Sequence, residues 1–188
     1  MTILLIILGG VVVLGLFLVG IYNRLVGLRQ TTNQAWSDIE VQLKQRQDLV
    51  PQLVNTVKGY AGHEKGTFEA VVQARAAAMG ATTVQGQAQA EGMLTQALGK
   101  LFALAEAYPE LKANENFLQL QDQLADIENK IAASRRFYNN AAKEYNTGRE
   151  QFPAIVFAGM MGFQERDYFE APEGRLELQT PPEVSFDT

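Results

Sequence analysis

The feature that most constrains this chain is an uninterrupted apolar segment at its N-terminus. Residues 3–21 read ILLIILGGVVVLGLFLVGI and contain no charged or strongly polar side chain. As an α-helix the segment is roughly 28 Å long, close to the hydrocarbon thickness of a bilayer. The alternatives are a buried core helix, unusually apolar for so small a domain, and a signal peptide, which needs a basic start and a small-x-small cleavage site. The segment has neither signal-peptide feature, so we predict an uncleaved transmembrane anchor over residues 1–22.

Basic residues around the anchor predict its orientation. No lysine or arginine precedes the apolar run, whereas Arg24 and Arg29 follow it closely. Because positive residues that flank a span favour the cytoplasmic side, we expect a short outer N-terminus and a cytoplasmic body. The predicted location is therefore the cell membrane, crossed once.

Residues 23–163 show the three–four spacing of apolar residues that is typical of helices. The first helix should continue from the anchor to about residue 60, with a bend near Pro51. A second should cover residues 63–79 and a third residues 93–108. Residues 80–92 mix Gly, Thr and Gln without periodicity, which indicates a loose loop.

The clearest helical pattern follows Asn114 and Asn116, either of which can serve as its N-cap. Its apolar stripe comprises Phe117, Leu120, Leu124, Ile127, Ile131, Ser134, Tyr138, Ala141 and Tyr145. We expect this helix to stop at Gly148. No strand pattern is convincing. The sequence thus predicts an all-α fold: an N-terminal transmembrane helix followed by an antiparallel bundle of about four long helices.

The C-terminal part of the chain divides into a patch and a tail. Residues 152–163 form a short apolar patch that is broken by Gly and Pro and is too short to cross a bilayer. Packing against the end of the bundle and contact with the membrane surface are the two interpretations. Residues 164–188 are acidic and contain three prolines, so we expect disorder in the last dozen residues.

Composition excludes several kinds of chemistry. The formal charge is -5, with 16 Lys+Arg against 21 Asp+Glu, which argues against nucleic-acid binding. There is no cysteine, and the one histidine, His63, precedes Glu64 without the second histidine of a zinc-binding H-E-x-x-H motif. Dinucleotide and P-loop motifs are missing as well. We therefore expect no catalytic residues, no metal, no cofactor and no enzyme; a hydrolase would have to depend on His63.

Polar side chains on the apolar stripes are the candidate functional residues. Arg46 should point inward, Arg75 lies on the stripe of the second helix, and Arg135 adjoins the stripe of the last. Their heads either reach water while their stems pack, or pair with inward acids such as Asp48 or Glu128. The candidate buried network or interaction site comprises Arg46, Asp48, Arg75, Tyr108, Arg135, Tyr138 and Tyr145.

Several blocks of the sequence resemble the LemA family. They include WSDIEVQLKQRQDLVPQLVNTVKGYAGHE (residues 36–64), YPELKANENF (residues 108–117) and RRFYNNAAKEYN (residues 135–146). The resemblance covers nearly the whole chain and ends before the tail. It implies a bacterial membrane protein with one N-terminal span, an antiparallel helical bundle, and no established enzymatic activity or catalytic residues.

Two functions are consistent with these observations. The first is a non-enzymatic, membrane-anchored scaffold that holds a protein partner or a second copy of itself at the lipid bilayer, with membrane organisation as a theme. The alternative is a sensor that binds a lipid or another anionic ligand between helices lined by Arg46, Arg75 and Arg135.

Overall fold

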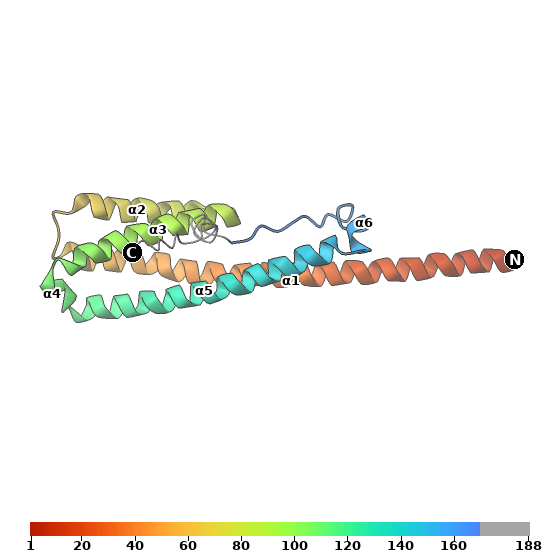
Figure 1. The fold of residues 1–188 in the computed structure, drawn as a ribbon, viewed down its shortest axis with the longest axis horizontal. Coiled ribbons are helices and arrows are strands. Elements are labelled where there is room, and N and C mark those ends of the chain that lie inside the picture. The colour runs from red at the N-terminus through yellow and green to blue at the C-terminus, as the bar shows by residue number, and fades with distance from the viewer. Residues whose placement is uncertain (170–188) are drawn as a thin grey trace, which may run out of the picture.

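The computed structural model describes residues 1–169, and in this part of the chain it contains six helices and no strand. The helices are α1 (Thr2–Lys58), α2 (Lys65–Gly80), α3 (Val84–Glu106), α4 (Pro109–Lys112), α5 (Glu115–Glu150) and α6 (Ala154–Ala158). The long helices alternate in direction (Figure 1). The predicted all-α fold with an antiparallel bundle is confirmed, whereas the expected disorder at the very end falls outside the described residues.

Helix α1 is both the apolar N-terminal segment and the first helix of the bundle. Its 57 residues would extend about 86 Å, and the helix continues through Pro51 without interruption. Among the described residues it is the one helix that is long and apolar enough to cross a membrane, and no residue of its most apolar stretch is buried. Its other half carries a buried stripe that runs from Leu25 to Val57. The apolar N-terminal segment therefore continues into the body without a linker.

Helices α2 and α3 form a hairpin against one half of α1 (Figure 1). The predicted loose loop over residues 80–92 is wrong, because α3 already begins at Val84. Thr83 caps it by accepting a hydrogen bond from the backbone N–H of Gly86 at 3.0 Å. Only residues 81–83 connect the two helices.

Helix α5 lies along α1 for most of its 36 residues (Figure 1). Asn114 is its N-cap and accepts a hydrogen bond from the backbone N–H of Phe117 at 3.0 Å. Gly148 does not end this helix, which continues to Glu150. A Cβ atom at Gly148 would lie 2.7 Å from Leu28 Cδ1, so the glycine permits the close approach of α5 to α1. Helices α1, α2, α3 and α5 are thus the expected four main helices of the bundle, with α1 and α5 the longest.

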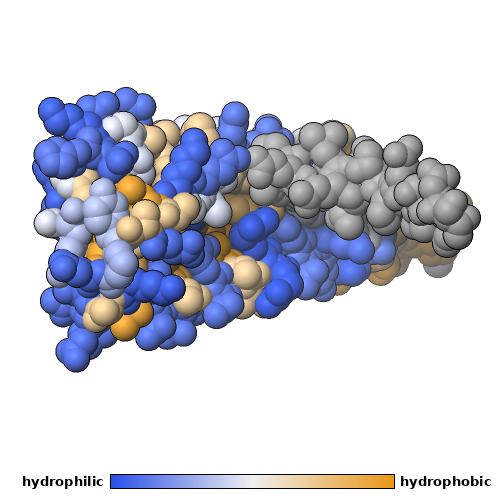
Figure 2. Space-filling view, turned by 60° about the vertical axis from the view of Figure 1, so that its left-hand side comes forward, coloured by the Kyte–Doolittle hydropathy of each residue, from blue (hydrophilic) through white to orange (hydrophobic). Residues whose placement is uncertain are grey.

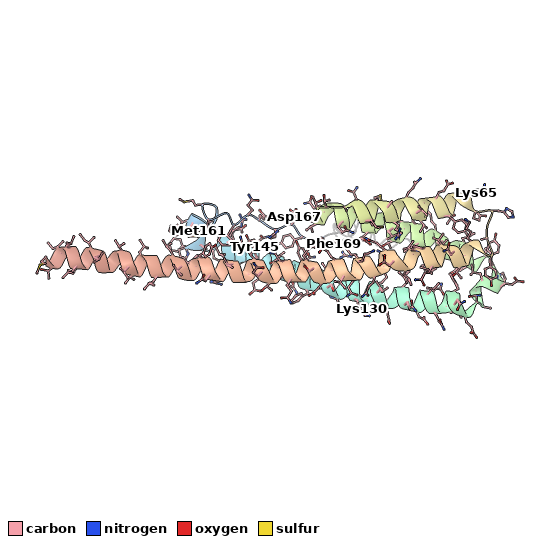
Figure 3. All side chains as sticks on the ribbon, turned by 180° about the vertical axis from the view of Figure 1, so that it is seen from behind. Lys65, Lys130, Tyr145, Met161, Asp167 and Phe169 are labelled. Carbon is pink, nitrogen blue, oxygen red and sulfur yellow. The ribbon has the colours of Figure 1, made fainter. Side chains whose placement is uncertain are left out.

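The chain returns along this helix pair after α6. Residues 164–169, which we call the strap, run from the region of Met161 past Tyr145 to Phe169 (Figure 3). The buried apolar residues form two clusters: a main core among α1, α2, α3 and α5, and a smaller one around Leu25 and Tyr145. The end of the bundle remote from the N-terminus is covered mainly by hydrophilic side chains (Figure 2).

Candidate functional site

Arg46 lies inside the four-helix part of the bundle with its side chain only 3% exposed. Its Nη1 atom lies 2.8 Å from Glu91 Oε2 on α3. Its Nη2 atom lies 2.8 Å from Glu128 Oε1 on α5 and donates to Thr95 Oγ1 at 2.7 Å. One guanidinium on α1 therefore joins α3 and α5 through charge-assisted hydrogen bonds, which are stronger than neutral ones.

Two glutamines and a second arginine extend these contacts. The Nε2 atoms of Gln47 and Gln87 donate to Glu91 Oε1 at 3.2 and 2.9 Å. Gln87 also donates to the backbone carbonyl of Ala78 at 3.1 Å, and Arg75 Nε donates to the carbonyl of Gln47 at 2.7 Å. Helices α1, α2, α3 and α5 thus share one hydrogen-bonded group. The arginine cluster, as we call it, consists of Arg46, Gln47, Arg75, Gln87, Glu91, Thr95 and Glu128.

Glu128 is the more accessible acid of the cluster, with 39% of its side chain exposed. Burial raises the pKa of its carboxyl above the ordinary value; attraction to Arg46 lowers this pKa, and repulsion from Glu91 raises it further. The net direction is upward. Desolvation therefore outweighs the attraction of Arg46 in setting the direction of this pKa.

A cleft of about 420 Å³ adjoins the arginine cluster between α1, α3 and α5. Its lining combines Phe102 and Leu124 with Arg46 and Glu128. Two carboxylates already face Arg46, so a further anion would meet negative charge beside the guanidinium. The arrangement is suited to fixing the relative positions of four helices, because a buried charge is tolerated only opposite its partners.

Asp48 and Tyr108 are the two predicted residues that belong neither to the arginine cluster nor to the contacts of residues 164–169. The expectation that Asp48 pairs with an inward arginine is corrected by the structure: its Oδ1 lies 2.6 Å from Lys44 Nζ on the exposed face of α1. Residues two apart on a helix, such as Arg46 and Asp48, point to different sides. Tyr108 directly precedes α4, where it is half-buried against the main core.

Tyr138 and Tyr145 hold the strap and take no part in the arginine cluster. The hydroxyl of Tyr145 donates to the backbone carbonyl of Gln164 at 2.8 Å, and that of Tyr138 donates to the carbonyl of Asp167 at 2.7 Å. Burial raises the pKa of Tyr138, so the phenol remains a hydrogen-bond donor at neutral pH. Figure 3 shows Tyr145 and Asp167 along the course of the strap.

The asparagine after each tyrosine clamps the strap at two points. Asn146 accepts from the backbone N–H of Arg166 and donates to its carbonyl, both at 2.9 Å. Asn139 makes the same pair of bonds with Phe169, at 2.8 and 3.2 Å. Seven helical residues rise about 10.5 Å, and three extended residues span about 10 Å. The heptad repeat of Tyr-Asn on α5 therefore matches the three-residue spacing along the strap.

Phe169 packs the end of the strap into the main core. Its ring centroid lies 5.9 Å from that of Trp36 on α1, whose ring also contacts Tyr138 at 5.4 Å. The guanidinium of Arg135 stacks over Phe169 at 5.1 Å, a cation–π contact that accounts for this predicted arginine. Arg135 on α5 thus contacts the strap through Phe169.

The sequence contained signals for the residues that were missed. Glu91 lies three residues before Leu94, and Gln87 lies four residues before Glu91. Both therefore continue the buried stripe of Leu94, Leu98 and Leu101 toward the N-terminus. Because both residues are polar, the spacing of apolar residues did not include them. The two Tyr-Asn dipeptides seven residues apart marked one face of α5, but nothing indicated that a later segment would lie on it.

Comparison with known proteins assigns these features to a family. The LemA family matches residues 35–186, and so reaches beyond the strap into the tail, further than the resemblance seen in the sequence. Magnetosome protein MamQ 2 of Paramagnetospirillum magneticum is 27% identical over 187 residues, covering 85% of this chain and 69% of the relative. Magnetosome protein MamQ of Magnetospirillum gryphiswaldense is 26% identical with the same coverage. Protein LemA of Metamycoplasma hominis is 26% identical over 164 residues, covering 86% of this chain and 75% of the relative.

The residues matched by the family include the arginine cluster and the Tyr-Asn pairs that bind the strap. The arginine cluster and the Tyr-Asn pairs of α5 all fall within residues 35–186, as does the strap. Because the match spans most of the chain, this protein belongs to the LemA family.

Proposed function

We propose that this chain is a non-enzymatic, membrane-anchored helical scaffold of the bacterial cytoplasmic membrane. It would hold a protein partner or a second copy of itself near the bilayer and so take part in membrane organisation. The observation that carries this proposal is the continuity of α1, which passes from an apolar segment without buried residues into the core of the bundle. An anchor without a linker fixes the body relative to the bilayer, which supports a scaffold that holds its partner at a set place.

Two further observations support the proposal. The polar groups of the arginine cluster bond to one another across four helices, which favours a structural use of these groups over a catalytic one. The magnetosome proteins among the relatives are in keeping with a role at a membrane. We further propose that the body is cytoplasmic, because Arg24 and Arg29 follow the apolar run.

Crosslinking in living membranes tests the scaffold. A photoreactive amino acid is placed at Val41, Val72 or Met79, apolar residues of the body that are 53%, 57% and 52% exposed. We expect one of these positions to give a discrete adduct, identified by mass spectrometry as a partner or as a second copy of the chain. The control is the same group at Leu14 in the apolar half of α1. Monomer alone from every body position would contradict the proposal.

Cysteine accessibility tests the orientation. The natural chain has no cysteine, so Val41→Cys and Thr2→Cys each provide a single thiol. In intact cells a membrane-impermeant maleimide should label Thr2→Cys and should reach Val41→Cys only after the membrane is opened. The reverse pattern would place the body outside.

A further inference from the structure

The exposed face of α6 and its flanking residues is unusually apolar for a protein surface. Phe152 and Met160 are 84% and 88% exposed, and Ile155 and Val156 are 56% and 55% exposed. Residues 152–163 contain no charged side chain. Exposed large apolar side chains gathered in one short segment generally mark an interaction site. We call Phe152, Ile155, Val156 and Met160 the α6 patch.

The α6 patch belongs to a folded element. Ala154 and Ala158 lie four residues apart on the opposite face of α6 and are buried against Leu25 and Tyr145. Gly162 adopts the left-handed conformation with φ 76°, which returns the chain so that Phe163 is buried in the same cluster. The outward direction of the α6 patch is therefore fixed by the packing beneath it.

The position of α6 along α1 shows at which level, relative to the end of the apolar run, the α6 patch lies. The ring of Phe163 lies 5.5 Å from that of Tyr22, and the guanidinium of Arg29 stacks over it at 5.1 Å. Leu25, buried under α6, is only four residues beyond the end of the apolar run at residue 21. Four helical residues rise about 6 Å, which is about the depth of the headgroup layer on each side of the hydrocarbon core. Figure 1 shows α6 beside α1 at this level, with the rest of the bundle further from the N-terminus.

We infer that the α6 patch inserts into the headgroup and upper acyl region of the bilayer from which α1 emerges. Transfer of Phe, Ile, Val and Met side chains from water into this region lowers the free energy. Tyr22 and the neighbouring arginines are typical of residues at the boundary between membrane and water. The body thus meets the membrane at two points, the anchor and the α6 patch. Two points restrict rotation of the body about α1 and its tilt. This inference rests on the membrane anchoring in the proposed function and adds a defined orientation to it.

Fluorescence quenching in vesicles tests the insertion with the full chain. Val41→Cys, Val156→Cys and Leu14→Cys replace residues that are 53%, 55% and 56% exposed. The three sites are therefore equally accessible, but they lie in the body, in the α6 patch and in the apolar run. Each variant carries one environment-sensitive dye and is reconstituted into phosphatidylcholine–phosphatidylglycerol vesicles. We expect lipids spin-labelled high in the acyl chain to quench the Val156 label several-fold more than the Val41 label, and aqueous iodide to show the opposite order.

Each outcome separates the inference from the proposed function. If the Leu14 label is quenched by lipid while the Val156 label behaves as the Val41 label does, the anchor holds and the insertion is wrong. A Val156 label shielded from both lipid and iodide would also overturn it, in favour of a protein contact. A Leu14 label untouched by lipid would contradict the anchor itself.

A second variant excludes an effect of the dye. With the label at Met160→Cys, the double substitution Phe152→Ser and Ile155→Ser should reduce lipid quenching several-fold, because the remaining surface favours insertion less. The control is Val72→Ser with Met79→Ser, which removes two exposed apolar residues from α2, away from α6. Unchanged quenching in the first pair would show that the dye alone enters the bilayer and would overturn the inference.

Discussion

The same pair of helices, α1 and α5, is covered in two different ways along its length. Far from the apolar N-terminal segment, the hairpin of α2 and α3 covers the pair (Figure 1), and the arginine cluster lies inside. Near the apolar N-terminal segment, α6 and the strap take this place (Figure 3). Helices satisfy their own backbone groups, whereas an extended strap cannot, so α5 supplies Tyr and Asn side chains as its partners. One half is specified by buried charge and the other by matched hydrogen-bond spacing.

This difference predicts different responses to substitution. The arginine cluster connects four helices, so its loss should destabilise the bundle as a whole. The strap contacts mainly α1 and α5, so its loss should open one region while the helices persist. Three substitutions test this comparison in order of decreasing effect.

The largest effect is expected from Arg46→Met. It leaves Glu91 and Glu128 without their buried counter-charge, and breaking such a pair destabilises by about 3–5 kcal/mol. The measurement is urea unfolding of the full chain in detergent, followed by far-ultraviolet circular dichroism. Lys44→Met, which breaks the exposed pair with Asp48, is the control and should lose no more than about 1 kcal/mol.

The physical cause of this loss can be checked separately. Replacing Arg46, Glu91 and Glu128 together by Met, Leu and Leu removes all three charges. It should recover much of the stability, since an apolar replacement of a buried ion group is often neutral or stabilising. Equal losses in the single and triple variants would mean that the charges are not the source.

A smaller and local effect is expected from Asn139→Ala. It removes both hydrogen bonds to Phe169, a loss of about 1–3 kcal/mol for the docking of the strap. Trp36, the one tryptophan of the chain, contacts Phe169, so its fluorescence should change while helix content is retained. Asn140→Ala, an exposed neighbour, is the control. Loss of helix in step with the fluorescence change would refute the local character of the strap.

The smallest effect is the pH dependence contributed by Glu128. Its pKa is raised from 4.5 in the folded state, so the folded chain binds more protons than the unfolded chain above that pH. The free energy of unfolding contributed by this group therefore falls as pH rises from 4.5 through the folded pKa. Glu128→Gln should lack this decline, so the stability of the natural chain relative to the variant should be higher at pH 4.5 than at pH 7. Glu144→Gln, which replaces an exposed residue of the same helix, should show no such difference. A difference of opposite sign for Glu128→Gln would mean that the attraction of Arg46 affects the pKa of Glu128 more strongly than desolvation does.

Much of the fold was predictable because the periodicity and the caps of a helix depend on residues that are close in the sequence. The stripe from Phe117 to Tyr145 identified α5, and Asn114 serves as its N-cap. The prediction that Gly148 ends α5 was wrong because glycine both ends helices and permits close contacts between helices. Which of the two roles applies here depends on Leu28, a residue far away in the sequence. The beginning of α3 was missed because its buried positions are polar residues whose partners lie on other helices.

The sequence by itself determined the apolar N-terminal segment, the helical class and the inward direction of Arg46, since each depends on hydrophobic length and period. Only the tertiary structure decided which acids face Arg46: Glu91 lies 45 residues further along the chain, whereas Asp48, nearer in sequence, points to water. It also decided that Asn139 binds a segment 30 residues later. Helical periodicity assigns each side chain to a face of its own helix. What lies opposite that face depends on how the connections bring distant segments together.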